Sequence, residues 1–142
     1  FLYQFLDRIL RGTSLRLPDG RSITSKDGMV RKFFRAKFWE MDPQHYQDVV
    51  FQPDPLPQDI AYGLLSEDEK NQLLYYGPEE KPLFIGHYWM SGLPAPIMPN
   101  IACLDYSAVK YGRLAAYRMD SETALQTNKF TWIKVEKPER HQ

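Results

Sequence analysis

The chain has 142 residues, 43% of them hydrophobic, so it can bury a core and its length suits one domain. Its 18 basic and 18 acidic side chains give a formal net charge of zero, which argues against a nucleic-acid-binding domain and against attraction to anionic membranes. The single cysteine, Cys103, excludes an internal disulfide and fits a reducing compartment, so we expect a cytoplasmic protein. No apolar run approaches the roughly 18 residues that a membrane span requires.

Apolar residues recur at helical spacing between residues 1 and 11, and Gly12 follows them. This pattern predicts an amphipathic helix that ends at the glycine. Because the chain opens at Phe1 inside this pattern, we expect it to be part of a longer protein.

Residues 15–24 alternate apolar and polar side chains around Pro18-Asp19-Gly20, which predicts a hairpin, and residues 25–28 predict a second turn. Residues 29–39 have an ambiguous period, but Arg31 and Arg35 lie four apart, which favours a helix. Their alternating basic and aromatic residues could stack on nucleic acid. Because the net charge is zero, we favour an amphipathic helix with a solvated basic face.

Residues 42–59 contain four prolines and predict irregular chain, in which His45 is an exposed surface histidine. Ser66 and Glu69 have the spacing of a capping box, so a helix is predicted to begin there. Gly77-Pro78 is predicted to end it.

Short apolar runs at residues 83–85, 101–104, 113–119 and 130–136 predict strands, the last three forming an antiparallel meander. Residues 92–99 contain three prolines and are predicted to be irregular, and the charged tail 137–142 is predicted to fray. The fold class is therefore α+β: a mixed and antiparallel strand meander with flanking helices, in a single or partial domain spanning residues 1–142.

The first of these strands is followed at once by Gly86 and His87. A histidine just after a buried strand is well placed for an active site, and a preceding glycine would let backbone approach closely. A neutral imidazole there could bind a metal or move a proton. The alternative is an ordinary histidine with one hydrogen-bond partner, since no second ligand follows at metal-site spacing.

Three motifs carry a resemblance to a known family: Phe-Ile-Gly-His-Tyr-Trp at 84–89, Ala-Cys-Leu-Asp-Tyr-Ser at 102–107 and Gly-Arg-Leu-Ala-Ala-Tyr-Arg at 112–118. With segments at 17–20, 26–31 and 35–39, they resemble the C-terminal part of calcineurin-like metallophosphoesterases. The match is to a bacterial branch related to symmetrical diadenosine tetraphosphatases and serine/threonine protein phosphatases. The resemblance extends from about Phe1 to Trp132.

The resemblance implies that His87 is the last protein ligand of a centre with two divalent metal ions of the Mn, Fe, Zn or Ni type. It implies that Asp105 or Tyr106 orients His87 or lines the substrate pocket, although a turn in which Asp105 caps backbone is an equal alternative. Arg31 and Arg35 could reach a substrate phosphate, or could be surface or ion-paired arginines.

The chain departs from the family pattern, because the other ligand motifs, Asp-x-His, Gly-Asp-x-x-Asp-Arg and Gly-Asn-His-Glu, do not occur in it. We therefore expect the C-terminal half of a two-sheet sandwich, with no tightly bound metal and no catalysis by these residues alone.

The expected substrate is a phosphorylated small molecule, a dinucleoside polyphosphate or a phosphoprotein, with no nucleic-acid or membrane partner. The N-terminal half of the same protein, or self-association, would cover exposed apolar surface. The alternative function is a non-catalytic binding domain that keeps the scaffold without the metal centre.

Overall fold

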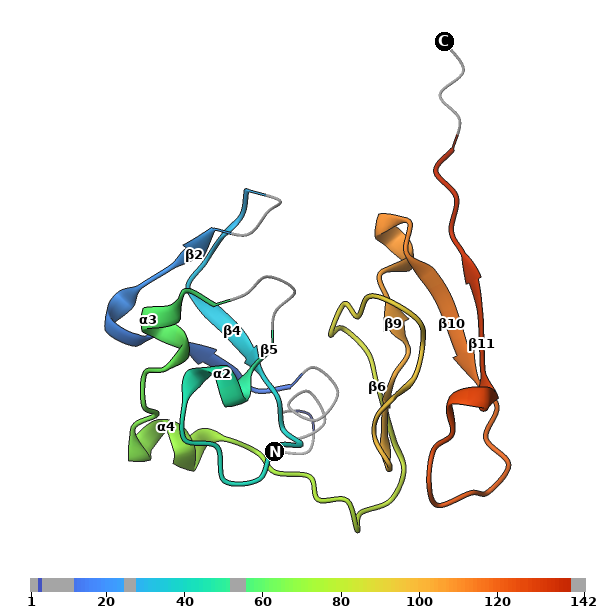
Figure 1. Cartoon of the computed structure of the whole chain (residues 1–142), viewed down its shortest axis with the longest axis horizontal. Helices are drawn as coiled ribbons and strands as arrows, with labels where there is room; N and C mark the ends of the chain where they lie inside the picture. Colours follow the sequence, from blue (N-terminus) through green and yellow to red (C-terminus); the bar gives the residue numbers. More distant parts are fainter. Residues whose placement is uncertain (1–2, 4–11, 25–27, 52–55, 139–142) are drawn as a thin grey trace. The chain divides into compact units, whose positions relative to one another are not determined.

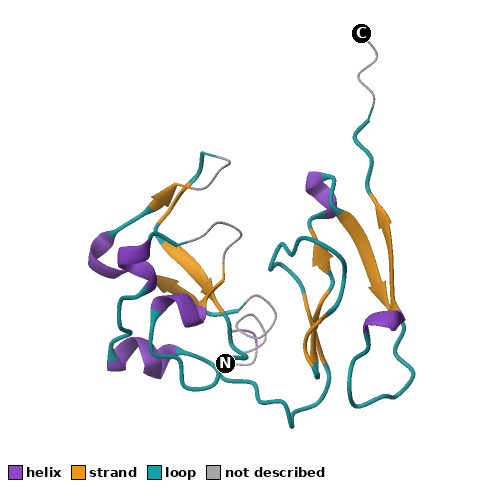
Figure 2. Cartoon of the chain, viewed as in Figure 1, coloured by secondary structure: helices purple, strands orange, loops and turns teal. Residues whose placement is uncertain are grey.

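The computed structural model describes residues 3, 12–24, 28–51 and 56–138 (Figure 1). The chain divides into two compact units, an N-terminal unit, Phe1–Gly77, and a C-terminal unit, Pro78–Gln142. Both contain small sheets, and helices and strands are mixed along the chain (Figure 2), which confirms the α+β class. Within the described ranges, no helix has the length and apolar character needed to cross a membrane.

The N-terminal unit combines a three-stranded sheet, a two-stranded sheet and short helices. Its elements are β1 (Ser14–Arg16), the 3₁₀ turn η1 (Pro18–Gly20), β2 (Ile23–Thr24), β3 (Val30–Arg31), β4 (Phe33–Ala36), α2 (Tyr46–Val49), β5 (Val50–Phe51), α3 (Gln58–Ala61) and α4 (Glu67–Gln72). The sheet order is β1-β4-β5, and β2 pairs with β3. All of these pairings are antiparallel.

The core of this unit forms where the sheet meets the helices. Phe34 of β4 packs edge-to-face against Tyr46 of α2, with ring centroids 6.1 Å apart. The Tyr46 hydroxyl donates to the Glu69 carboxylate of α4, and burial together with this contact raises the pKa of Tyr46. The cluster consists of apolar side chains from every layer: Leu15, Leu17, Ile23, Phe34, Tyr46, Val49, Val50, Ile60 and Leu65.

The predicted hairpin over residues 15–24 is wrong, because β1 pairs with β4, and β2 pairs with β3. The Pro-Asp-Gly segment does turn, but the strands that flank it belong to different sheets. Leu15 and Leu17 are both buried. The alternation of apolar and polar residues therefore shows which face of the strand is buried, but it does not show which strand is the partner.

The predicted helix over residues 29–39 is also wrong, because this segment forms β3 and β4. Phe34 and Ala36 point to the core whereas Phe33 is exposed, which is the two-residue period of a strand. The four-residue spacing of Arg31 and Arg35 is compatible with both structures, so it could not decide between them.

Residues 42–59 are more regular than predicted, since they contain α2, β5 and the start of α3. The predicted helix over residues 1–11 and residues 139–142 of the predicted tail lie outside the described residues, apart from Tyr3.

The capping box of α4 is confirmed. The Ser66 hydroxyl accepts a hydrogen bond from the Glu69 backbone nitrogen at 3.2 Å, and the Glu69 carboxylate accepts one from the Ser66 nitrogen at 2.9 Å. The helix ends at Gln72, earlier than the predicted Gly77, because Leu73 has extended dihedral angles and packs against the core.

The C-terminal unit contains two three-stranded sheets. Its elements are β6 (Leu83–Ile85), β7 (Pro96–Met98), β8 (Ile101–Cys103), β9 (Asp105–Tyr106), the 3₁₀ turn η2 (Ala108–Lys110), β10 (Arg113–Tyr117), the 3₁₀ turn η3 (Thr127–Lys129) and β11 (Phe130–Lys134). One sheet has the order β6-β8-β7 and the other β11-β10-β9.

The four predicted strands are confirmed to within two residues at each end. The predicted meander is wrong in one respect, because β8 does not pair with β10. β8 lies between β6, to which it is parallel, and β7, whereas β10 pairs with β9 in an antiparallel manner. Residues 92–99 are not all irregular, because Pro96 opens β7, an edge strand where a missing N–H is tolerated.

We predict that Ser66→Ala lowers the free energy of unfolding by about 1 kcal/mol, because it removes the acceptor for one amide at the start of α4. Urea denaturation measures this change. Ser22→Ala is the matched control, since Ser22 is an exposed serine of the same unit. Equal effects of the two substitutions would contradict a capping role for Ser66.

Candidate functional site

The candidate site is the turn that follows β6 in the C-terminal unit. His87 and Trp89 have left-handed backbone conformations, with φ values of 67° and 47°. Histidine adopts this region more readily than most residues, but a bulky tryptophan there is an outlier that costs on the order of 1 kcal/mol or more. Both side chains are exposed, whereas Tyr88 between them is 1% exposed and fixes the turn in the core. Strained backbone of this kind gathers at functional sites.

Asp105, the first residue of β9, connects this strand to the His87 turn. One carboxylate oxygen accepts a hydrogen bond from the His87 backbone nitrogen at 3.1 Å, and the other accepts from the Ser107 nitrogen at 3.0 Å. A role of Asp105 in lining a substrate pocket stays a prediction. The observed carboxylate caps backbone, which is the alternative to that role. It positions the histidine through the main chain.

Two further contacts hold the end of the turn. The Met90 nitrogen donates to the Asp105 carbonyl at 2.9 Å, and the Ser107 hydroxyl donates to the Met90 carbonyl at 3.2 Å. Asp105 and Ser107 therefore fix residues 87–90 at both ends, which keeps the position of His87 defined despite its exposure.

Tyr106 supports the chain beyond the turn. Its hydroxyl accepts a hydrogen bond from the Ala95 nitrogen at 3.0 Å and donates one to the Ala95 carbonyl at 3.3 Å. Burial raises the pKa of this phenol. The side chain is 3% exposed, so Tyr106 braces the loop between β6 and β7.

Gly112, and not Gly86, is the glycine that this site requires. A β-carbon on Gly112 would lie 2.2 Å from the Tyr106 carbonyl oxygen, whereas a β-carbon on Gly86 would meet no atom within 4 Å. The expectation that Gly86 allows close backbone approach is therefore wrong. The close approach occurs where η2 returns the chain to β10.

Arg113 makes two contacts that the sequence did not reveal. Its guanidinium donates to the Gly92 carbonyl at 2.7 Å and lies 4.7 Å from the centre of the Trp132 ring. Arg113 therefore ties the loop after the His87 turn to the β10–β11 hairpin, a distant contact that no local motif records.

Arg31 and Arg35 lie in the N-terminal unit, on β3 and β4. Arg31 is opposite Ile23, and Arg35 is opposite Ser14 and Phe51. Their predicted contact with a substrate phosphate stays a prediction. His45, in the same unit, precedes α2, and its backbone nitrogen donates to Asp48 at 2.8 Å.

A hollow of about 360 Å³ opens in the N-terminal unit, and sequence reasoning did not anticipate it. Its lining carries both signs of charge: Lys37, Glu40, Met41, Asp42, Pro43, Gln47 and Asp48. The Asp48 carboxylate accepts hydrogen bonds from the backbone nitrogens of Gln44 and His45, which lower its pKa. The lining therefore has mixed charge, and one of its carboxylates is already engaged by backbone.

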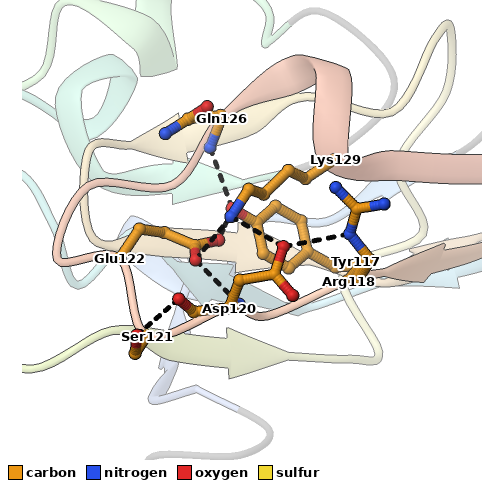
Figure 3. Close-up of polar contacts among 7 residues, drawn as sticks. All are labelled: Tyr117, Arg118, Asp120, Ser121, Glu122, Gln126 and Lys129. Atoms are coloured by element: carbon orange, nitrogen blue, oxygen red, sulfur yellow. Dashed lines mark hydrogen bonds and ion pairs between the residues drawn. The ribbon is translucent and has the colours of Figure 1, made fainter.

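A second group of charged side chains closes the connection between β10 and β11 (Figure 3). The Lys129 ammonium lies 2.7 Å from the Glu122 carboxylate and 3.2 Å from that of Asp120. The Tyr117 hydroxyl also donates to Glu122, at 2.6 Å, and accepts from the Gln126 nitrogen. The bond from Lys129 is the main cause that lowers the pKa of Glu122 to about 2. Because each polar group has a partner inside the loop, this group is a structural clasp.

The resemblance predicts that His87 is one ligand of a metal centre, and this role stays a prediction. Its exposed position on a braced turn suits an imidazole ligand, since a fixed ligand keeps its geometry. Across the described ranges, no three His, Cys, Asp or Glu side chains gather where they could hold a metal ion.

No protein-family model matches the chain, and neither a curated protein nor a solved structure matches it. The resemblance to calcineurin-like metallophosphoesterases therefore stays a prediction.

We predict that Asp105→Ala loosens the His87 turn, because it removes the acceptor for two backbone N–H groups. The expected cost is about 2 kcal/mol of unfolding free energy. Hydrogen exchange should also accelerate at the His87 and Ser107 amides. The Leu83 amide, which donates to Asn100 at 2.8 Å in the sheet, is the internal control. Unchanged exchange at His87 would contradict the positioning role.

The clasp gives a second prediction, for pH. The folded pKa of Glu122, about 2, lies below its ordinary value of 4.5, so its contribution to stability is complete above about pH 4.5 and is lost as the pH falls towards 2. Thermal unfolding between pH 6 and 2 should show a weaker acid dependence for Glu122→Gln than for the wild type. Glu136→Gln, an exposed glutamate of the same unit, should follow the wild type. Parallel curves for all three proteins would contradict this role.

Proposed function

We propose that this chain is the C-terminal portion of a metal-dependent phosphoesterase and that His87 is one of its metal ligands. The observation that carries the proposal is the strained turn at His87, held by Asp105 at the end of β6. A turn that stores strain and is braced by several contacts is more than a surface loop needs. The resemblance of the three motifs that build this turn supports the same assignment.

In this proposal, the residues of the chain hold and orient one ligand. Asp105 and Ser107 fix the backbone on either side of the imidazole, and Tyr106 and Arg113 fix the loop that follows. When bound, two divalent metal ions would supply an activated water and neutralise charge on the phosphoryl oxygens. The remaining ligands would come from the N-terminal half of a two-sheet sandwich.

The second candidate is a non-catalytic binding domain with the same scaffold. Within the described residues, no three metal-ligating side chains gather at one place, which is the observation that favours this candidate. The two candidates differ in whether the protein made by its source carries metal that depends on His87.

We predict that His87→Asn removes metal from the protein as its source produces it. Asparagine tolerates the left-handed backbone, so this variant removes the imidazole while it preserves the turn. Metal analysis should give two divalent ions per chain for the wild type and a clear loss for the variant. Phosphatase activity should fall by at least about a hundredfold, because second-shell changes alone cost 10- to 100-fold.

The matched control is His45→Asn, because asparagine is also a favoured residue at the start of a helix. This variant should keep both the metal and the activity. Normal metal content and activity in His87→Asn would overturn the proposal and favour the binding domain.

A further inference from the structure

Strand β11 forms an edge of the β11-β10-β9 sheet (Figure 1). It pairs with β10 without a register shift, from Phe130 opposite Tyr117 to Lys134 opposite Arg113. No strand in the described part of the chain pairs with its other side. The strand has neither a bulge nor a proline, so its outer edge is regular enough to accept a further strand.

The hydrogen bonds of the hairpin show which backbone groups of β11 face outward. The Val135 nitrogen donates to the Gly112 carbonyl at 3.0 Å, so the backbone of Val135 faces the β10 side. Successive residues of a strand direct these groups to opposite sides, and Lys134 and Trp132 therefore face the open edge. Their N–H and C=O groups are the ones to which a further strand would bond.

Lys134 and Arg113 place two positive charges directly opposite each other on neighbouring strands. Like charges at such positions destabilise a sheet. Within the described residues, neither side chain forms an ion pair with a carboxylate, that of Glu136 included. The buried Nε atom of Arg113 also has no hydrogen-bond partner among these residues. The positive charge of the pair therefore favours an acidic ligand at this edge.

The other face of the hairpin is apolar at the same place. Ile133 is 62% exposed and lies opposite Leu114 of β10, which is 59% exposed. Val135 follows two residues after Ile133, and side chains two apart lie on the same face of a strand. A strand added beside β11 would therefore meet a cation on one face and apolar side chains on the other.

We infer that β11 binds an extended acidic segment of a partner protein, which adds to the sheet as a further antiparallel strand. Both pairings of β10 are antiparallel, so the added strand continues the pattern of this sheet. Its backbone bonds to Trp132 and Lys134, as in other proteins that bind peptides at a sheet edge. An acidic side chain opposite Lys134 forms a charge-assisted hydrogen bond with the ammonium group. Apolar side chains on either side of it contact Ile133 and Val135, so the recognised sequence is apolar–acidic–apolar.

Charge favours such a segment over a second copy of this chain. No side chain of β11, Phe130–Lys134, is acidic, so a second β11 would bring no carboxylate to Lys134. Lysine on an edge strand is also a common means of preventing pairing between copies. The inference goes beyond the proposed function, because it involves neither His87 nor a metal ion.

The test uses the full chain and two end-blocked peptides, Ser-Val-Glu-Val-Glu-Val-Ser and the same sequence with lysine in place of glutamate. Calorimetric titration measures both affinities. We expect the glutamate peptide to bind at least about tenfold more tightly, because the lysine peptide places like charges together. Hydrogen exchange locates the contact. The bound peptide should slow exchange at the Trp132 and Lys134 amides but not at the Val135 amide, which already donates to Gly112.

Lys134→Glu should reverse the preference between the two peptides. This variant should also raise the thermal midpoint of unfolding, since it replaces a repelling pair with opposite charges across from Arg113. Lys32→Glu, at an exposed lysine of the N-terminal unit, is the matched control and should leave the preference unchanged.

Methylated peptides test the backbone contact separately from charge. Methyl groups on the glutamate nitrogens should abolish binding, because these N–H groups bond to β11 in an antiparallel pair. Methyl groups on the valine nitrogens, which point away from β11, should not.

Equal affinities for the two peptides would overturn the inference, as would binding that survives methylation of the glutamate nitrogens. Sedimentation that shows a dimer with protected Trp132 and Lys134 amides in the absence of peptide would place a second copy at this edge and overturn it as well. His87→Asn should bind the glutamate peptide as the wild type does, so this inference and the proposed function can fail independently.

Discussion

The hydrogen bonds that Asp105 accepts are the constraint on which the C-terminal unit depends. A single carboxylate holds the backbone nitrogens of His87 and Ser107, which are distant in sequence. A carboxylate is a strong acceptor, and two N–H groups use both of its oxygens. His87 and Ser107 both have left-handed backbone, so the carboxylate holds the chain at two strained positions.

The position of Asp105 follows from the way the chain passes between the two sheets of this unit. Residues 101–106 run through β8, pass Leu104 and continue as β9 in the other sheet. Ile101, Ala102 and Cys103 are fully buried, which anchors the chain before Asp105. Gly112 permits the close return of the chain on the other side, where any β-carbon would clash with the Tyr106 carbonyl.

The charged groups of the chain divide into two kinds. In the clasp at the β10–β11 connection, Lys129 and Glu122 satisfy each other and close the loop. At the His87 turn, the carboxylate is used on backbone, and the imidazole and the neighbouring lysines face outward. The first arrangement stabilises a hairpin. The second fixes the backbone that carries His87, the residue on which the phosphoesterase proposal rests.

Some of this architecture could be predicted from the sequence because the signals are local. The capping box of Ser66 and Glu69 lies within one helical turn, and the strands after residue 82 are short apolar runs between turn residues. The turn in which Asp105 caps backbone is one of two alternatives for this residue, and the hydrogen bond to the His87 nitrogen shows this turn.

The tertiary structure decided which strands pair, which glycine is crowded and which backbone is strained. Residues 29–39 carry a period that fits a helix or two strands, and only pairing with β1, β2 and β5 made them strands. The contact of Arg113 with Gly92 and the crowding of Gly112 by Tyr106 join residues that no local pattern connects. The sequence by itself therefore determined where the α4 helix starts and where the later strands lie, because the interactions that set these features join residues only a few positions apart. The geometry of the site came from contacts between distant segments, which exist only once the chain has folded.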